Sequence, residues 1–303
     1  MSLPLRRSTR RRPVSAAVHA LPLHYELIPT KSFDQAMADL PAHAHVSVTC
    51  SPVRGIAATQ ECSLRLLGLG HRVVPHFAAR MVEDREHAAK LARWLREYSI
   101  NEVFVVAGDA PEPLGPYEGA FAFIRDLLDG DPGVERVGVT GYPEGHAAID
   151  EQVLSGQLAA KNDLLQSAGI DGWVSTQMCF DPVAIRAWIH RQRALGIALP
   201  IRLGVPGVVD RTRLMTLGAR LGIGASLRYL GKNRSTIKRL MAPGGYDPTA
   251  LLAAFDDDVE TLGIEALHSF TFNSVAETRA WHEAIVTSEH IQLSGRVGGG
   301  SPR

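Results

Sequence analysis

Residues 171–205 read DGWVSTQMCFDPVAIRAWIHRQRALGIALPIRLGV and predict one strand–helix–strand unit. Two short runs, 172–178 and 200–205, have the apolar, β-branched character of strands that are buried on both faces. Between them, Asp181 and Pro182 form a helix start signal, an N-cap followed by proline at the first helical position. Two strands joined by a helix in this way favour a parallel pair.

The same alternation runs along most of the chain. The eight predicted strands are 24–28, 45–50, 72–77, 102–106, 136–140, 172–178, 200–205 and 266–272. Asp247-Pro248 repeats the helix start signal, and a helix is predicted over 83–99 because apolar side chains line one face. These side chains are Ala88, Leu91, Leu95 and Tyr98. Eight such units, with no chain left for a second domain, predict a single (β/α)8 TIM-type barrel of the α/β class.

Both ends of the chain depart from this alternation. The first twelve residues contain five arginines and no acid, and Pro4 and Pro13 interrupt any amphipathic helix. We interpret 1–20 as a disordered basic tail, although an Arg-rich, acid-poor segment is also typical of a transit peptide. Residues 293–303 are rich in Gly and Ser and are predicted to form a flexible tail. The catalytic barrel then spans 21–292.

The composition argues against several classes of protein. Lys and Arg number 32, as do Asp and Glu, so the chain lacks the basic surplus of a nucleic-acid-binding protein. No run of about 18 apolar residues could span a membrane. Three cysteines without a C-x-x-C pair indicate a reducing, cytoplasmic location. No histidines and carboxylates have metal-ligand spacing and no G-x-G-x-x-G occurs, so no metal site or Rossmann fold is predicted.

The candidate site residues come from the carboxyl ends of the strands, where barrel enzymes have their active sites. Glu26 lies inside a short apolar strand, where a carboxylate is costly to bury unless it is used or held in a structural ion pair. Asp109 follows a glycine after the fourth strand and either acts in the site or caps the next turn. The remaining strands deliver Thr49, His76, Tyr142, His146, Gln177, Arg202, Gly204 and Asn273.

These strand-end segments resemble the methylenetetrahydrofolate reductase family over roughly residues 22–275. The family's first strand carries an essential Glu in a phrase like FEFFPP, and YELIPT places Glu26 there. Later phrases match in order: VSVTCSP with Thr49, PHFA with His76, VAGD with Asp109, YPEGHA with Tyr142 and His146, TQMCFD with Gln177, and GVPG. Each fragment alone is weak, but their common order on the predicted strands is a strong signal.

The resemblance implies reduction of 5,10-methylenetetrahydrofolate to 5-methyltetrahydrofolate by NADH or NADPH, in the family normally through bound FAD. Glu26 and Asp109 would be the catalytic residues: Glu26 would protonate the leaving nitrogen as the five-membered ring opens, and Asp109 would stabilise the iminium cation. Gln177 and Thr49 would bind the folate, Gln177 through the amide-like edge of the pterin. The cofactor-binding residues would be His76, Ala107, Gly108, Tyr142, His146 and Lys161.

The chain departs from the family at its flavin contacts. The arginine of the family's LRGD phrase is Ala107 here. An arginine after the last strand, which the family uses near the folate tail, is Ser274. If Lys161 is the family's lysine, the preceding flavin-binding Asp and Asn become about Leu154 and Gln157. Each lost charge-assisted hydrogen bond is worth about 1.5–3 kcal/mol. We therefore expect FAD to be absent or weakly bound, with hydride passing directly from NAD(P)H to the folate.

Two other functions stay open at this point. A proline dehydrogenase-like flavin enzyme would share the barrel, but its arginine-rich substrate motif is not seen near the last strand. A catalytically silent folate-binding protein would explain the altered flavin contacts. Such a protein would need neither Glu26 nor Asp109, whereas the chain has both.

Overall fold

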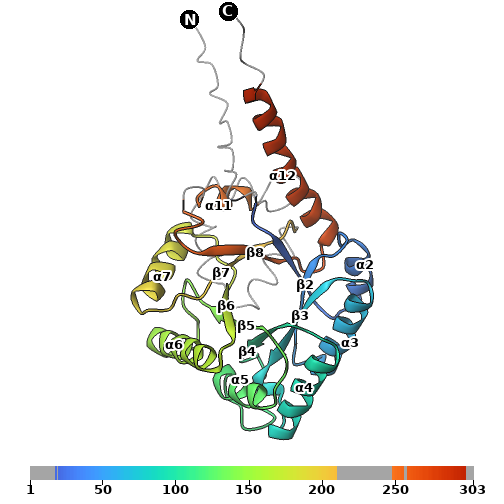
Figure 1. Ribbon diagram of the computed structural model, residues 1–303, viewed down its shortest axis with the longest axis vertical. Coiled ribbons are helices and arrows are strands. Elements are labelled where there is room, and N and C mark those ends of the chain that lie inside the picture. Colours follow the sequence, from blue (N-terminus) through green and yellow to red (C-terminus); the bar gives the residue numbers. More distant parts are fainter. Residues whose placement is uncertain (1–17, 19, 210–247, 256–257, 298–303) are drawn as a thin grey trace, which may run out of the picture.

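The computed structural model describes residue 18 and residues 20–209, 248–255 and 258–297. In this part of the chain, eight parallel strands pair in sequence order, and the eighth returns to the first to close a barrel (Figure 1). Helices follow the strands and lie around the outside of the barrel (Figure 1). The predicted single (β/α)8 barrel is confirmed.

All eight predicted strands are present, and each begins and ends within two residues of its expected limits. The strands are β1 (Leu23–Leu27), β2 (His45–Val48), β3 (Arg72–Ala78), β4 (Glu102–Val106), β5 (Arg136–Gly141), β6 (Asp171–Thr176), β7 (Ile201–Pro206) and β8 (Ile264–Phe270). The described helices are α2 (Phe33–Ala38), α3 (Gly55–Gly68), the 3-10 turn η1 (Ala79–Met81), α4 (Arg85–Glu97), α5 (Ala120–Asp129), α6 (Glu151–Ala168), α7 (Pro182–Ala194), α11 (Thr249–Leu252) and α12 (Val275–Val297).

The helix start signal at Asp181 is confirmed. Its carboxylate accepts a hydrogen bond from the Val183 backbone N–H at 2.9 Å, and Pro182 is the first residue of α7. The second signal lies partly outside the described residues, because these begin again at Pro248, which precedes α11. On α4 the expected apolar face is buried except for Tyr98, which is 41% exposed. Tyr98 caps the helix end instead of lying on its face.

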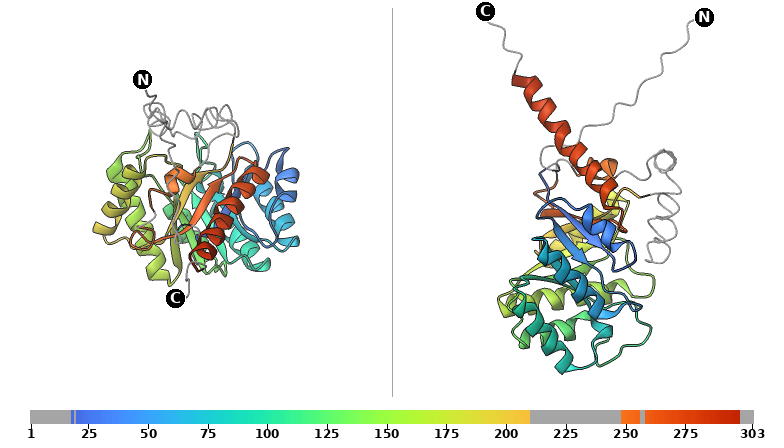
Figure 2. Two further views of the ribbon diagram at one scale, coloured as in Figure 1. Left: turned by 90° about the horizontal axis from the view of Figure 1, so that it is seen from above. Right: turned by 90° about the vertical axis from the view of Figure 1, so that its right-hand side faces the viewer.

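The ends of the barrel differ from the expected limits. Val18, expected in the basic tail, is 3% exposed and packs in the hydrophobic core. At the other end α12 continues to Val297, beyond the expected start of the Gly/Ser tail at residue 293. Figure 2 shows α12 leaving the barrel beside α2 and projecting away from it. Among the described residues, a core contact at Val18 and the last turns of α12 therefore lie outside the limits that the sequence pattern predicts.

Charged side chains fill the amino end of the barrel. Arg202, the second residue of β7, is 2% exposed, pairs with Glu102 at 2.9 Å and Glu265 at 3.0 Å, and lies over the Trp173 ring at 3.8 Å. The expectation that Arg202 reaches the strand ends is therefore wrong, because its place early in β7 puts it at the opposite mouth. In (β/α)8 barrels, residues at the amino-terminal mouth usually stabilise the fold and take no part in catalysis.

A layer of aromatic side chains lies above these charges. Phe104 and Trp173 stack with ring centroids 6.2 Å apart, and both belong to one small buried cluster with Val74. Gly138 on β5 provides the space, because a Cβ at that position would collide with the Trp173 and Phe104 rings. This layer separates the charged amino end from the candidate site at the carboxyl end.

Candidate active site

Glu26 faces the barrel interior near the carboxyl end of β1. Alternation along the strand sends Leu23, Tyr25 and Leu27 into the core that packs against the helices, so Glu26 lies on the opposite face. Its Oε2 lies 3.0 Å from Nε2 of His268 on β8. The two side chains are only 12% and 4% exposed. The part-buried carboxylate is thus paired, and it lies close enough to the strand ends to meet a ligand.

His76 on β3 lies beside this pair. Its ring centroid is 6.1 Å from that of His268 and 4.6 Å from that of Phe104. Burial lowers the pKa of His76 to about 4, with Glu26 opposing and His268 adding to that shift, so the ring is neutral at pH 7. Its buried Nε2 has no hydrogen-bond partner among the described residues.

Thr49 directly follows β2, at the level of His76. The pairing of Val48 with Pro75 places the two residues side by side, and the Thr49 N–H donates to the Leu27 carbonyl at 2.9 Å. The Thr49 hydroxyl is buried and, within the described chain, also lacks a partner. Buried polar groups are nearly always hydrogen-bonded, so two unpaired ones at adjacent strand ends indicate a place for a ligand or water.

Asn273, after β8, fixes the end of β1 instead of offering its side chain to a ligand. Its Oδ1 accepts from the Ile28 N–H at 2.8 Å and its Nδ2 donates to the Ile28 carbonyl at 2.9 Å. Thr271 adds a bond from its hydroxyl to the Glu26 carbonyl at 2.5 Å. These bonds set the position of the backbone that carries Glu26.

Asp109 belongs to a different group of contacts. It is exposed, in the loop between β4 and α5, and its charge acts on Tyr142 at the end of β5. Burial raises the pKa of the Tyr142 phenol, a hydrogen bond with Thr140 lowers it, and the Asp109 carboxylate raises it again. The two carboxylates predicted as catalytic, Glu26 and Asp109, therefore lie on different sides of the barrel mouth.

Tyr142 has two further expected site residues as neighbours. The His146 ring meets it edge-on at 5.4 Å between centroids, although His146 itself is exposed. Gln177, after β6, is tied to this strand end because its N–H donates to the Gly141 carbonyl at 2.7 Å. Its Oε1 accepts from the N–H of Met178 at 2.8 Å, which fixes the orientation of the amide.

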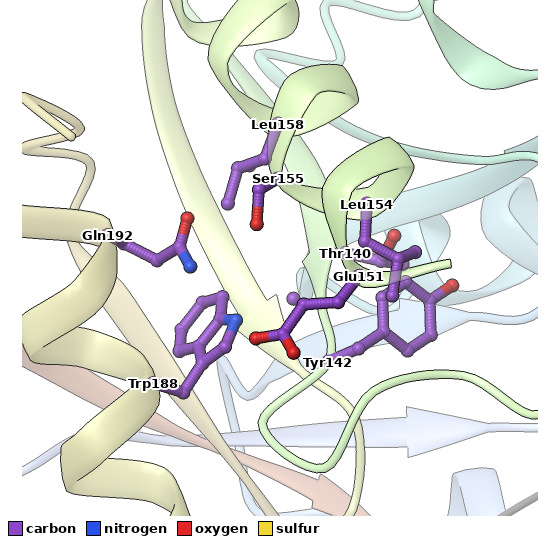
Figure 3. A pocket seen from close by; sticks show the side chains of 9 residues that line it. Thr140, Tyr142, Glu151, Leu154, Ser155, Leu158, Trp188 and Gln192 are labelled. Carbon is purple, nitrogen blue, oxygen red and sulfur yellow. The ribbon is translucent and has the colours of Figure 1, made fainter. Parts of the chain in front are cut away.

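A small cavity lies behind Tyr142, between α6 and α7 (Figure 3). Its volume of about 20 Å³ has room for a water molecule. Gln192 faces it with a buried Oε1 that has no partner among the described residues, opposite Leu154 and beside Trp188 (Figure 3). Leu154, one of the two positions where the resemblance expects a polar flavin contact, lines this cavity with apolar carbon.

Lys161, expected to bind the cofactor, lies further along α6 and is 8% exposed. Burial lowers the pKa of its amine to about 8. Burial accounts for this shift, and no charged neighbour among the described residues contributes to it. Ala107 and Gly108, the remaining expected cofactor contacts, begin the loop that carries Asp109.

Sequence reasoning missed His268. A signal was present, because His268 falls inside the predicted eighth strand, and a buried polar residue in a strand needs a partner just as Glu26 does. The partner could not be named in advance, since that depends on which face each strand turns inward. The structure thus assembles one group from Glu26, His268, His76 and Thr49, and a second from Asp109, Tyr142, His146 and Gln177.

Among the described residues, no group of three His, Cys, Asp or Glu side chains is arranged to hold a metal ion. In the same part of the chain, none of the helices has the length and apolar character needed to cross a bilayer. Cys50, Cys62 and Cys179, all in the described part of the chain, are not joined in disulfides.

No protein-family model matches the chain. Among solved structures, it is similar to DHPS of Yersinia pestis, in a complex with a pterine-sulfa conjugate, at 12% identity and a TM-score of 0.46, over 90% of this chain and 95% of that one. It is also similar to dihydropteroate synthase of Thermus thermophilus, at 16% identity and a TM-score of 0.47, over 92% of this chain and 99% of that one. A third similar structure is type I 3-dehydroquinate dehydratase of Clostridium difficile, at 10% identity and a TM-score of 0.47, over 90% of this chain and 93% of that one. Similarity this distant does not identify an activity.

Proposed function

We propose that this protein is a methylenetetrahydrofolate reductase-type enzyme, which reduces 5,10-methylenetetrahydrofolate to 5-methyltetrahydrofolate with NADH or NADPH. The observation that carries the proposal is the part-buried Glu26–His268 pair, 3.0 Å apart at the carboxyl end of the barrel. Beside it lie two buried polar atoms, on His76 and Thr49, that have no hydrogen-bond partner in the described part of the chain. The order of strand-end motifs that resembles this family supports the choice of reaction.

The first step assigned to these residues is a proton transfer. The methylene carbon of the substrate is held between two nitrogens, and it accepts hydride only after one C–N bond breaks to give an iminium cation. A Glu26 carboxyl group would deliver the proton to the leaving nitrogen, and His268 would hold that carboxyl in place through Nε2. Neutral His76 would add no positive charge that opposes formation of the cation.

The second step is hydride transfer to the iminium carbon. Asp109, at the opposite side of the mouth, would supply a fixed negative charge that stabilises the cation. Tyr142 and His146 offer an aromatic surface beside it for the nicotinamide ring of the hydride donor. The products are 5-methyltetrahydrofolate and the oxidised dinucleotide.

The residues present do not fit FAD. A bound flavin dinucleotide needs cations or polar groups for its diphosphate and ribityl chain. Ala107 offers no charge, Leu154 presents apolar carbon, and the Lys161 amine is buried with its pKa lowered to about 8. We therefore propose direct transfer from NAD(P)H to the folate, and no step is assigned to a flavin.

Three measurements on the purified protein test this function. The visible absorption spectrum should show no flavin band at stoichiometric level, and NADH should be oxidised when 5,10-methylenetetrahydrofolate is added without FAD. Glu26→Gln should lower kcat by about 100- to 10,000-fold while folate affinity is retained, which separates an enzyme from a silent binding protein. A stoichiometric flavin band, or activity that strictly requires FAD, would contradict the flavin-free mechanism.

A further inference from the structure

Arg80 holds the loop that carries Asp109. Arg80 lies in η1, directly after β3, and its side chain is only 19% exposed. Its Nε donates to the Ala110 carbonyl at 2.7 Å and its Nη2 to the Pro111 carbonyl at 2.8 Å. These are the two residues that directly follow Asp109 in the chain.

The backbone of Arg80 holds the same loop at two more points. Its N–H donates to the Ala107 carbonyl at 2.9 Å, and its carbonyl accepts from the Leu114 N–H at 2.8 Å. The guanidinium also reaches Glu118, whose Oε2 lies 2.6 Å from Nη1, just before α5 begins. One residue thus bonds to both sides of Asp109.

Two glycines allow the loop to lie this close. Gly108 has a φ of +94°, and a Cβ there would come within 2.8 Å of the Ala78 Cβ. A Cβ at Gly115 would collide with the Glu83 carbonyl oxygen. The loop is therefore packed directly on the backbone after β3, and Arg80 provides the polar contacts of that packing.

We infer that Arg80 is a positioning residue, which sets the place of the Asp109 carboxylate at the barrel mouth through the Ala110 and Pro111 carbonyls. The inference rests on the proposed function for the role of Asp109, but the contacts stand without it. A guanidinium suits this task because its donors have a fixed planar arrangement, which a lysine ammonium cannot reproduce. Misplacing a charged group by about 1 Å can cost about 100-fold in rate.

The test is a double-mutant cycle with Arg80→Ala, Asp109→Ala and the double variant, in full-length protein. Arg80→Ala should lower kcat by about 10- to 100-fold with little change in the KM for the folate. In the Asp109→Ala background the same change should cost almost nothing further, since there is no carboxylate left to position. Equal losses in both backgrounds would show a merely structural role and would overturn the inference.

Two controls complete the design. Glu118→Ala removes the exposed end of the network and keeps the carbonyl contacts, so kcat should stay within about twofold of wild type. Arg80→Lys should behave like Arg80→Ala, and added guanidinium ion should restore part of the rate of Arg80→Ala. Full activity of Arg80→Lys would contradict the need for the planar set of donors of a guanidinium group.

Hydrogen exchange separates this inference from the proposed function. Arg80→Ala should speed amide exchange over residues 107–118 and leave the strands unchanged. If the wild-type protein shows no turnover with methylenetetrahydrofolate, the proposed function fails, and the exchange experiment still decides whether Arg80 holds the loop. Unchanged exchange in that loop would overturn the positioning role by itself.

Discussion

Glu26 Oε2 and His268 Nε2 lie 3.0 Å apart, although 242 residues separate them in the chain. They meet because β8 pairs with β1 to close the barrel. His268 is buried and Glu26 is largely so, at 12% exposed, so the hydrogen bond is formed in a medium of low polarity, where its orientation is well defined. The pair can therefore hold a proton at a fixed place at the strand ends.

Glu26→Gln should lower kcat by about 100- to 10,000-fold, because a positioned general acid contributes about that much. The amide keeps the shape of the side chain and can still meet His268, so the protein should fold and bind folate. Steady-state kinetics and a binding titration measure the two effects separately. Glu86→Gln, an exposed acid on α4, is the matched control and should retain wild-type rates.

His268→Gln should act through Glu26. We expect a loss of about tenfold or more in kcat in the wild-type background, and almost no further loss in the Glu26→Gln background, because residues that act as a unit are non-additive. The four proteins of this cycle are compared under the same conditions. If the two losses simply multiply, His268 has no special relation to Glu26.

Lys161→Met should stabilise the protein at neutral pH. The folded-state pKa of about 8 lies below the ordinary 10.5, so the folded protein disfavours the charged amine and gains stability as pH rises from about 8 to 10.5. Below pH 8 the whole penalty applies, and its removal should add about 3 kcal/mol to the free energy of unfolding. Urea unfolding at several pH values measures this.

The control for this change is Lys90→Met on α4, which removes an exposed amine and should leave the pH dependence as it is. The Lys161→Met gain should shrink above pH 8 and vanish above pH 10.5. A loss of stability at pH 7 would instead mean that the charged amine has a favourable partner in the folded protein.

Gly138→Ala should destabilise the barrel by about 1–3 kcal/mol, the usual cost of overpacking a dense core. The added methyl group would meet the Trp173 and Phe104 rings, which have no space to retreat inside the barrel. Gly156→Ala on α6 is the control, because nothing lies within 4 Å of its added Cβ. That change should be neutral or stabilising by about 0.5–1 kcal/mol, since alanine favours helix. Thermal or urea unfolding compares both variants.

The strands could be predicted because each one is a short run of apolar, β-branched residues, which is a local pattern. Side chains alternate along a strand, so Glu26 faces the barrel interior once its neighbours Tyr25 and Leu27 face the helices. The prediction for Arg202 is wrong, because Arg202 lies at the amino-terminal mouth. Its place early in β7 decides which mouth it reaches, and a short apolar run does not show where the strand begins. The Glu26–His268 pairing and the Arg80 contacts depend on barrel closure and on a loop path, which no local pattern contains.

The central claim is direct hydride transfer from the nicotinamide to the folate, and an isotope experiment tests it most directly. The purified protein is given 5,10-methylenetetrahydrofolate and NADH that carries deuterium at the transferred position, in ordinary water without added FAD. The account predicts that the deuterium appears in the methyl group of 5-methyltetrahydrofolate. Product without deuterium would contradict it, because a reduced flavin exchanges its transferable hydrogen with water, and absence of product without FAD would contradict it as well.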